Sequence, residues 1–277
     1  MVPLSPELIA AQVRAALDED LGEGDLTAAL IAESDSLSVQ LICREPAVLC
    51  GRPWFDQSFR QLDPGVAIDW LAGEAEQVAA NQLLCRIEGN ARALLSAERT
   101  ALNYLQTLSG TATLAHRYAQ AVAGTGVRIL DTRKTLPGLR LQQKYAVQCG
   151  GCHNHRLGLY DAILIKENHI AAAGSLSAAL KAAQGIAQGV GIEVEVESLQ
   201  QLDEALAAGA GHLLLDNFPL QRLREAVVRN AGRARLEASG NVSLETVRAI
   251  AETGVDDISV GGLTKDLRAV DFSLRFF

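Results

Sequence analysis

From Val127 onward, short runs rich in valine, isoleucine and leucine alternate with segments of helical spacing. This alternation predicts parallel strands joined by crossover helices, because a parallel neighbour can be reached only through a long connection. We expect helices to begin near Ser175, Ser198, Pro219 and Ser243. The predicted strands span residues 127–131, 162–166, 192–196, 212–216, 235–239 and 257–261. Such a unit forms either an open sheet or an α/β barrel.

Each predicted strand ends in a polar residue or a glycine. In an α/β barrel the C-terminal ends of the strands meet at one face, and that face carries the active site. Six separate segments therefore point to a single site, and this placement favours the barrel. The strand-end groups are Asp131-Thr132-Arg133-Lys134, Lys166, Glu195, Asp216-Asn217, Ser239-Gly240 and Gly261-Gly262.

The first part of the chain has a different pattern of apolar residues. The apolar spacing after Ser5 and Pro6 predicts a helix that ends before Gly22. Alternating patterns then predict strands, with a helix between the first two, so this part is α+β. The predicted strands span 37–43, 66–71 and 83–87, and the helix spans 53–62.

A long apolar segment joins the two parts. Asn90 suits the N-cap of a helix that runs to about Leu108, and Ser109-Gly110 predicts a break before a second helix at 111–122. We therefore expect an N-terminal α/β domain at residues 1–110 and an α/β barrel domain at 111–277, and the C-terminal tail could pack back on the first domain.

Composition and net charge limit the kinds of ligand and partner that the protein can bind. The chain has 277 residues and a formal net charge of −8, which argues against a nucleic-acid binder. The first ten residues lack a basic start and an apolar run, and no later apolar run approaches the roughly 20 residues of a spanning helix, so we expect no membrane association. An odd set of five cysteines suits a reducing cytoplasm. Any anionic ligand must then be captured by a local cationic cluster.

Such a cluster follows from Arg133, Lys134, His155, Arg156 and Lys166. Arginine presents a planar fork that matches a carboxylate or phosphate, whereas lysine acts as a point charge. Glycines directly before the His-Arg pair let backbone N–H groups approach an anion. The cluster predicts a site for a dicarboxylate or a phosphorylated sugar, and the alternative for Arg133-Lys134 is a solvated basic loop.

Two motifs allow other chemistry. Lys166 at a strand end could be a Schiff-base nucleophile of an aldolase, or it could form a structural ion pair with Glu167. Cys149, Cys152 and His153 match the attachment pattern of c-type haem, which would make the protein an electron carrier. The same cysteines with His153 and His155 could instead form a cramped zinc site.

The remaining strand ends suit a metal and a phosphate. Glu195 and Asp216 follow successive strands, so they should be neighbours that could bind Mg²⁺, directly or through water, or ribose hydroxyls. The glycine-containing ends of the last two strands lie where barrels bind phosphate monoesters. These ends are Ser239-Gly240-Asn241 and Gly261-Gly262.

Together these motifs resemble the quinolinate phosphoribosyltransferase family over nearly the whole chain. The resemblance implies an N-terminal α/β sandwich domain followed by an incomplete α/β barrel. It also implies a pentosyltransferase of NAD biosynthesis that joins quinolinate to phosphoribosyl pyrophosphate. The motifs are Glu23-Gly24-Asp25-Leu26-Thr27, Ser96-Ala97-Glu98-Arg99-Thr100-Ala101-Leu102-Asn103, Asp131-Thr132-Arg133-Lys134-Thr135, Asn154-His155-Arg156, Ile165-Lys166-Glu167-Asn168-His169, Glu193-Val194-Glu195-Val196-Glu197, Leu215-Asp216-Asn217 and Glu237-Ala238-Ser239-Gly240.

The resemblance also assigns roles. It places the quinolinate carboxylates among Arg99, Arg133, His155, Arg156 and Lys166, with Thr132 in the substrate site and Lys134 near the pyrophosphate. Glu195 and Asp216 would hold ribose hydroxyls and Mg²⁺, and together with Lys134 and Lys166 would be catalytic. Ser239, Gly240, Asn241, Gly261 and Gly262 would take the 5′-phosphate. Arg99 would enter the site of a partner, which implies at least a homodimer.

The sequence departs from the family pattern at two glycines. Cys152 stands where many members have a third glycine before the His-Arg pair, and Asn241 stands where a second glycine often follows Ser-Gly. Because asparagine tolerates left-handed backbone, we expect Asn241 to keep that loop.

Overall fold

The computed structural model describes residues 4–187 and 189–276 and separates into two compact units. The first unit comprises the described residues of Met1–His116, Gln142–Gly150 and Leu267–Phe277, and the second comprises those of Arg117–Leu141 and Gly151–Asp266. The first ten residues lack the basic start and the apolar run of a secretory signal peptide, and the first three of them lie outside the described part. No helix in the described ranges is long and apolar enough to cross a membrane.

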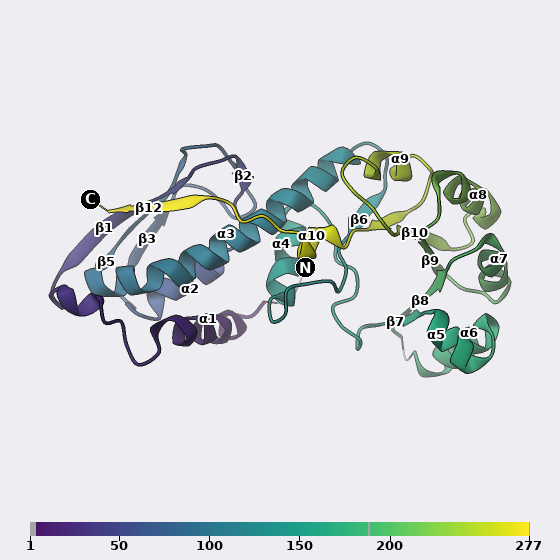
Figure 1. The fold of residues 1–277 in the computed structure, drawn as a ribbon, viewed down its shortest axis with the longest axis horizontal. Helices are drawn as coiled ribbons and strands as arrows, with labels where there is room; N and C mark the ends of the chain where they lie inside the picture. Colours follow the sequence, from purple (N-terminus) through teal and green to yellow (C-terminus); the bar gives the residue numbers. More distant parts are fainter. Residues whose placement is uncertain (1–3, 188, 277) are drawn as a thin grey trace. The chain divides into compact units, whose positions relative to one another are not determined.

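A four-stranded antiparallel sheet organises the first unit, in the order β12-β1-β5-β3 (Figure 1). Apolar residues of its inner face, such as Val39 and Ile87, pack against Phe55 and Leu94 from two helices. The unit is therefore the predicted α/β sandwich. Its elements are β1 (Ser36–Cys43), β2 (Ala47–Val48), α2 (Arg52–Arg60), β3 (Ala67–Trp70), β4 (Gln77–Val78), β5 (Leu83–Asn90), α3 (Ala91–Ala121) and β12 (Phe272–Phe276).

Two further helices complete this unit. The predicted first helix is confirmed as α1 (Pro6–Leu21), whose first turn is capped by the Ser5 hydroxyl. The sequence did not predict α4 (Arg140–Cys149). Three of its buried residues, Gln142, Gln143 and Lys144, are polar, so the helix has no continuous apolar stripe that a periodicity argument could detect.

The predicted break at Ser109-Gly110 is wrong, because α3 continues through both residues to Ala121. A Cβ atom on Gly110 would overlap the backbone carbonyl of Arg268, and the neighbouring Val270 N–H donates to the carbonyl of Gln106. Gly110 thus serves close packing of the C-terminal segment on the helix. The N-cap prediction is confirmed, since Asn90 Oδ1 accepts the Ala93 N–H at 3.1 Å.

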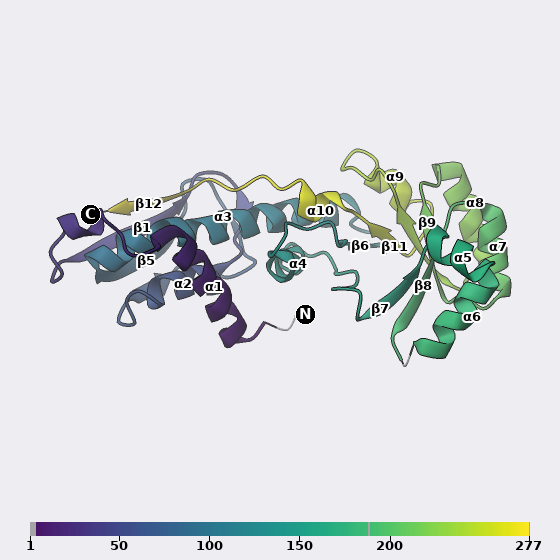
Figure 2. The ribbon, with the colours of Figure 1, turned by 60° about the horizontal axis from the view of Figure 1, so that its bottom comes forward.

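The second unit is built on a six-stranded parallel sheet in the order β6-β11-β10-β9-β8-β7. Helices cover its outer side (Figure 2). The edge strands β6 and β7 do not pair with each other in the described ranges, so the unit is the incomplete barrel that the resemblance implies. All six predicted strands are present, as β6 (Arg128–Leu130), β7 (Ala162–Ile165), β8 (Gly191–Val196), β9 (His212–Asp216), β10 (Arg235–Ser239) and β11 (Asp257–Ser259).

The crossover helices follow the predicted starts. The hydroxyls of Ser175 and Ser198 accept N–H groups of the first turns of α6 and α7, which fixes where these helices begin. The last predicted helix starts later than expected, after Thr246. The helices are α5 (Glu167–Ala173), α6 (Leu176–Ile186), α7 (Leu199–Ala207), α8 (Leu220–Asn230), α9 (Val247–Ala251) and α10 (Gly262–Lys265).

The packing at Gly110 yields a stability prediction. Gly110→Ala should lower the free energy of unfolding, because overpacking costs about 1–3 kcal/mol and outweighs the helix-propensity gain of about 1 kcal/mol. The matched control is Gly185→Ala in α6, where a Cβ would meet nothing within 4 Å. Urea denaturation of both variants is the measurement, and a Gly110→Ala protein as stable as the control would contradict this account.

Candidate active site

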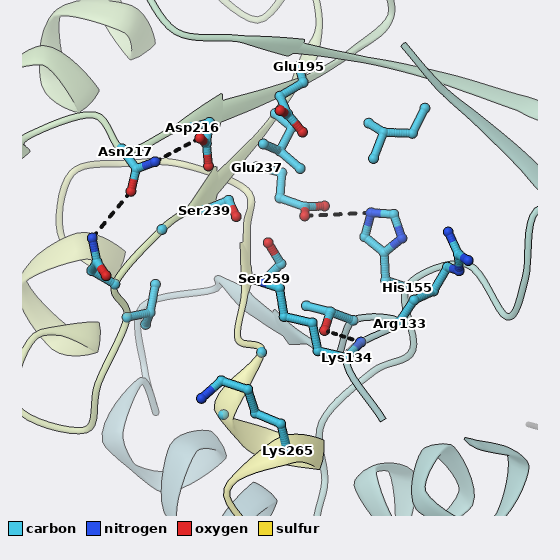
Figure 3. Close-up of a pocket in the computed structure, with 18 of the residues that line it drawn as sticks. Arg133, Lys134, His155, Glu195, Asp216, Asn217, Glu237, Ser239, Ser259 and Lys265 are labelled. Atoms are coloured by element: carbon cyan, nitrogen blue, oxygen red, sulfur yellow. Dashed lines mark hydrogen bonds and ion pairs between the residues drawn. The ribbon is translucent and has the colours of Figure 1, made fainter. Parts of the chain in front are cut away.

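The carboxyl ends of the parallel strands surround a pocket of about 730 Å³ in the second unit (Figure 3). Side chains that are far apart in the sequence meet here, as the strand-end pattern predicts. Each site residue predicted from the sequence lines this pocket, with the exception of Arg99. The lining includes Thr132, Arg133, Lys134, His155, Arg156, Lys166, Glu195, Asp216, Ser239, Gly240, Asn241, Gly261 and Gly262.

Asp131 organises the cationic end of the pocket. It is fully buried after β6, and its carboxylate accepts the His155 N–H at 2.9 Å and the Asn154 amide at 2.6 Å. His153 extends the sheet by bridging to Leu130, with its N–H donating to the Ile129 carbonyl at 2.8 Å. The loop that carries the His-Arg pair is thereby held beside the strand that leads to Arg133.

Two guanidinium groups lie close together at this end. Burial first, and then the charge of Arg133, lower the pKa of Arg156 from its ordinary value. The Nε of Arg133 is buried and has no hydrogen-bond partner among the described residues. A buried donor without a partner is costly, and like charges repel. An anion bound between these arginines would remove both penalties.

The carboxylates at the ends of β8 and β9 lie on neighbouring strands, as predicted. Lys166 Nζ donates to Glu195 Oε2 at 2.6 Å, so its ion-pair partner is Glu195 and not Glu167. The carboxylate of Glu195 thus engages the Nζ that a Schiff-base mechanism would need as a free nucleophile. Asp216 accepts a hydrogen bond from the Asn217 amide at 2.7 Å and also faces the pocket (Figure 3).

The opposite end of the pocket is a cradle of small residues. Gly240 and Asn241 have left-handed backbones, with φ of 102° and 50°, and this confirms the expectation for Asn241. A Cβ on Gly240 would overlap the side chain of Asn217, so only glycine fits there. Gly261 approaches the Lys134 side chain, where a Cβ would lie 3.0 Å from Cδ. Such a loop lets backbone N–H groups come close to a phosphate.

Buried charge lies behind the pocket. His155 Nε2 is 2.9 Å from Glu193 Oε2 and 3.6 Å from Glu237 Oε1. Burial alone would raise the pKa of Glu193, but His155 outweighs it and the pKa is lowered. Burial, and then the charge of Glu193, raise the pKa of Glu237 to about 8. The two carboxyl groups therefore differ in protonation near neutral pH.

Sequence reasoning missed several lining residues. Glu237 and Ser259 lie two positions before Ser239 and Gly261, so the period of two in a strand could have placed them on the same face. Asn217 belongs to the predicted strand-end group Asp216-Asn217 but was given no role, and Lys265 lies beyond the predicted Gly261-Gly262 strand end. The missed lining residues are Tyr118, Leu164, Leu214, Asn217, Glu237, Val242, Ser243, Ser259, Lys265 and Asp266.

The haem and zinc interpretations do not fit Cys152. Its side chain is 4% exposed, and burial raises the pKa of its thiol to about 12. A thiol that stays protonated is a poor nucleophile and a poor metal ligand. Arg99 lies on α3 in the first unit, where its side chain is exposed.

Comparison with known proteins agrees with this geometry. Two domain models of the quinolinate phosphoribosyl transferase family match, the N-terminal domain at residues 25–109 and the C-terminal domain at residues 111–275. The nicotinate-nucleotide pyrophosphorylase [carboxylating] of Mycobacterium leprae is 43% identical over 272 residues, which cover 95% of each chain. The probable enzyme of the same name from Bacillus subtilis is 40% identical over 92% of this chain and 89% of its own.

A solved structure is also similar to the chain throughout. The nicotinate-nucleotide pyrophosphorylase from Francisella tularensis has 43% sequence identity and a TM-score of 0.96, and the match covers 100% of this chain and 98% of that chain. With both domain models matched and relatives at this level of identity, the chain belongs to the quinolinate phosphoribosyltransferase family.

Proposed function

We propose that the protein transfers the phosphoribosyl group of phosphoribosyl pyrophosphate to quinolinate and releases pyrophosphate and carbon dioxide, giving nicotinate mononucleotide for NAD biosynthesis. The observation that carries this proposal is the pair of half-buried arginines Arg133 and Arg156, which lie close together and leave the Nε of Arg133 without a hydrogen-bond partner among the described residues. The phosphate cradle and the carboxylates at Glu195 and Asp216 in the same pocket support it. We place the reaction in the cytoplasm, where the five cysteines would stay reduced.

The acceptor would bind at the cationic end. Quinolinate carries two adjacent carboxylates, and the forks of Arg133 and Arg156 can each take one in bidentate geometry. Lys166, tied to Glu195, adds a point charge at the edge of this subsite. Held there, the pyridine nitrogen would be directed at the ribose, and this positioning supplies much of the rate acceleration.

The residues at the middle of the pocket fit a magnesium ion. Mg²⁺ takes hard oxygen ligands, usually one or two carboxylates together with substrate phosphates. Asp216 and Glu195 offer such oxygens from adjacent strands, and they would hold the ion or the ribose hydroxyls. When bound, the ion would neutralise charge on the leaving pyrophosphate.

The donor would occupy the rest of the pocket. Ser239, Gly240, Asn241, Gly261 and Gly262 would hold the 5′-phosphate, and Lys134 would stabilise the charge of the departing pyrophosphate. As the bond from ribose C1 to the pyrophosphate oxygen breaks, the pyridine nitrogen bonds to C1. When the adjacent carboxylate then departs as carbon dioxide, the electron pair of the broken carbon–carbon bond stays on the ring carbon. The neighbouring positive nitrogen stabilises this pair until the carbon uses it to bond a proton.

A paralogous transferase with another pyridine acceptor is the second candidate. We expect carbon dioxide and pyrophosphate to be released from quinolinate, phosphoribosyl pyrophosphate and Mg²⁺, with nicotinate a poor acceptor because it offers one carboxylate to two arginines. Product analysis with each acceptor is the measurement. Use of nicotinate without use of quinolinate would refute the proposal.

Removal of one guanidinium tests the acceptor subsite. Arg133→Ala should lose about 2–5 kcal/mol of binding and transition-state stabilisation, which lowers kcat/KM at least about thirtyfold. Arg222→Ala, on the exposed side of α8, is the control and should keep normal turnover. Steady-state kinetics of both variants are the test, and near-normal turnover of Arg133→Ala would overturn the assignment.

We also propose that the protein is at least a homodimer in which Arg99 completes the site of its partner. Its exposure on α3 and its absence from the residues that line the pocket of its own chain support a role in another subunit.

Mixing two inactive variants tests this exchange. Hybrids of Arg99→Ala and Arg133→Ala subunits would contain one intact site, so random exchange should restore about a quarter of wild-type activity. If Arg99 serves its own subunit, the mixture stays inactive, and that result would contradict the exchange.

A further inference from the structure

Two buried glutamates lie against the His155 ring at the acceptor end of the pocket. Glu193 on β8 and Glu237 on β10 approach the same nitrogen of His155, at 2.9 and 3.6 Å. Their side chains are 6% and 0% exposed. Figure 3 shows Glu237 and His155 pointing toward one another at the rear of the pocket. Neither glutamate has a part in the proposed reaction.

The other nitrogen of His155 is also engaged. Nδ1 accepts the backbone N–H of Arg156 at 2.7 Å. A ring nitrogen that accepts a hydrogen bond carries no proton, so the proton of the neutral ring lies on Nε2, which donates to Glu193. The ring is thus fixed from both sides, and the backbone of Arg156 is fixed with it.

We propose that Glu193 and Glu237 are positioning residues: they hold the His155 imidazole, and through it the backbone of Arg156, in the geometry that receives the acceptor's carboxylates. The inference rests on the proposed function, since it assigns these residues to the quinolinate subsite. Neither glutamate needs to touch the substrate. Their effect should therefore appear in quinolinate affinity and leave phosphoribosyl pyrophosphate affinity nearly unchanged.

The carboxyl groups of Glu193 and Glu237 can lie beside the same His155 nitrogen because they are not both charged at neutral pH. Burial and the charge of Glu193 raise the pKa of Glu237 to about 8, so Glu237 is mostly protonated at neutral pH. A protonated carboxyl can donate a hydrogen bond to its neighbour. The charged and titratable groups that face Glu237 are Glu193 from β8, His212 from β9, Asp257 from β11 and His155 from the loop before β7.

A bound metal ion is the competing explanation for this cluster. Ligand atoms of His155, Glu193 and Glu237 lie within 4.8 Å of one another. A metal would need an unprotonated nitrogen, yet His155 Nε2 carries the ring proton. The cluster is better explained by a proton shared among its members than by a cation.

The two glutamates should respond differently to amidation. Glu193→Gln removes the charge that anchors His155 and should raise the KM for quinolinate by at least about tenfold, with the KM for phosphoribosyl pyrophosphate within about twofold. Glu237→Gln imitates the protonated acid, so at pH 7 it should raise the KM for quinolinate less than Glu193→Gln does. His212→Gln is the control: its Nε2 lies 3.5 and 3.7 Å from the same carboxyl groups, but His212 does not line the pocket.

A pH series gives a readout that a purely structural role would not produce. The pKa of Glu237 is raised in the folded protein, so its contribution to stability is complete below the ordinary value of 4.5 and is lost as pH rises through about 8. The melting temperature of the wild-type protein should fall as pH rises from about 5 to about 8, and its quinolinate affinity should fall as Glu237 ionises in the folded protein around pH 8. Glu237→Gln should lose neither, because it has no proton to release.

Calorimetric binding of quinolinate separates the possible failures. Wild-type protein that binds no quinolinate would refute the proposed function. Wild-type protein that binds it with the same affinity as Glu193→Gln, or that shares its pH profile with Glu237→Gln, would overturn only the positioning role. A stoichiometric metal that is present in purified wild-type protein and absent from Glu193→Gln would also overturn the positioning role. If Glu193→Gln does not fold, the comparison of the pH profiles of wild type and Glu237→Gln tests the positioning role instead.

Discussion

The second unit depends on ion pairs that are buried on the inner side of its open parallel sheet. Every second residue of the parallel strands faces this side, where the inner positions of most barrels are filled by branched apolar side chains. Here Asp257 is fully buried and accepts hydrogen bonds from Arg128 and Arg235. These bonds outweigh the effect of burial and lower the pKa of Asp257. Because an unpaired buried charge costs several kcal/mol, each such group needs a partner on a neighbouring strand.

The functional pocket continues the same arrangement toward the strand ends. Glu237 is the register partner of Asp257, and it lies near His155, which also meets Glu193. At the strand ends, Lys166 pairs with Glu195. At the acceptor end, the guanidinium groups of Arg133 and Arg156 lie close together, and the Nε of Arg133 has no hydrogen-bond partner among the described residues. The pocket thus presents a cationic end to the substrate.

Much of this organisation could be predicted because its signals are local. Strand-helix alternation and polar strand ends predicted the parallel unit and many of the lining residues, and Ser175 and Ser198 marked helix starts. What was missed depends on distant parts of the chain. Gly110 suggested a break, but its role is set by Arg268, which lies far along the sequence. Glu237 lies within an apolar strand, and nothing near it in the sequence identifies His155 as its partner.

The helix α4 escaped prediction for a related physical reason. The polar residues Gln142, Gln143 and Lys144 are buried in α4, which hides the apolar stripe that usually marks a helix. In this protein, buried polar groups therefore mark the places where tertiary partners override local patterns.

The most direct test of this account is a crystal structure of the protein with quinolinate bound. We predict one carboxylate on each of Arg133 and Arg156, with the His155 ring still hydrogen-bonded to Glu193. A bound quinolinate that leaves the Nε of Arg133 without a partner, or a His155 ring turned away from Glu193, would contradict it.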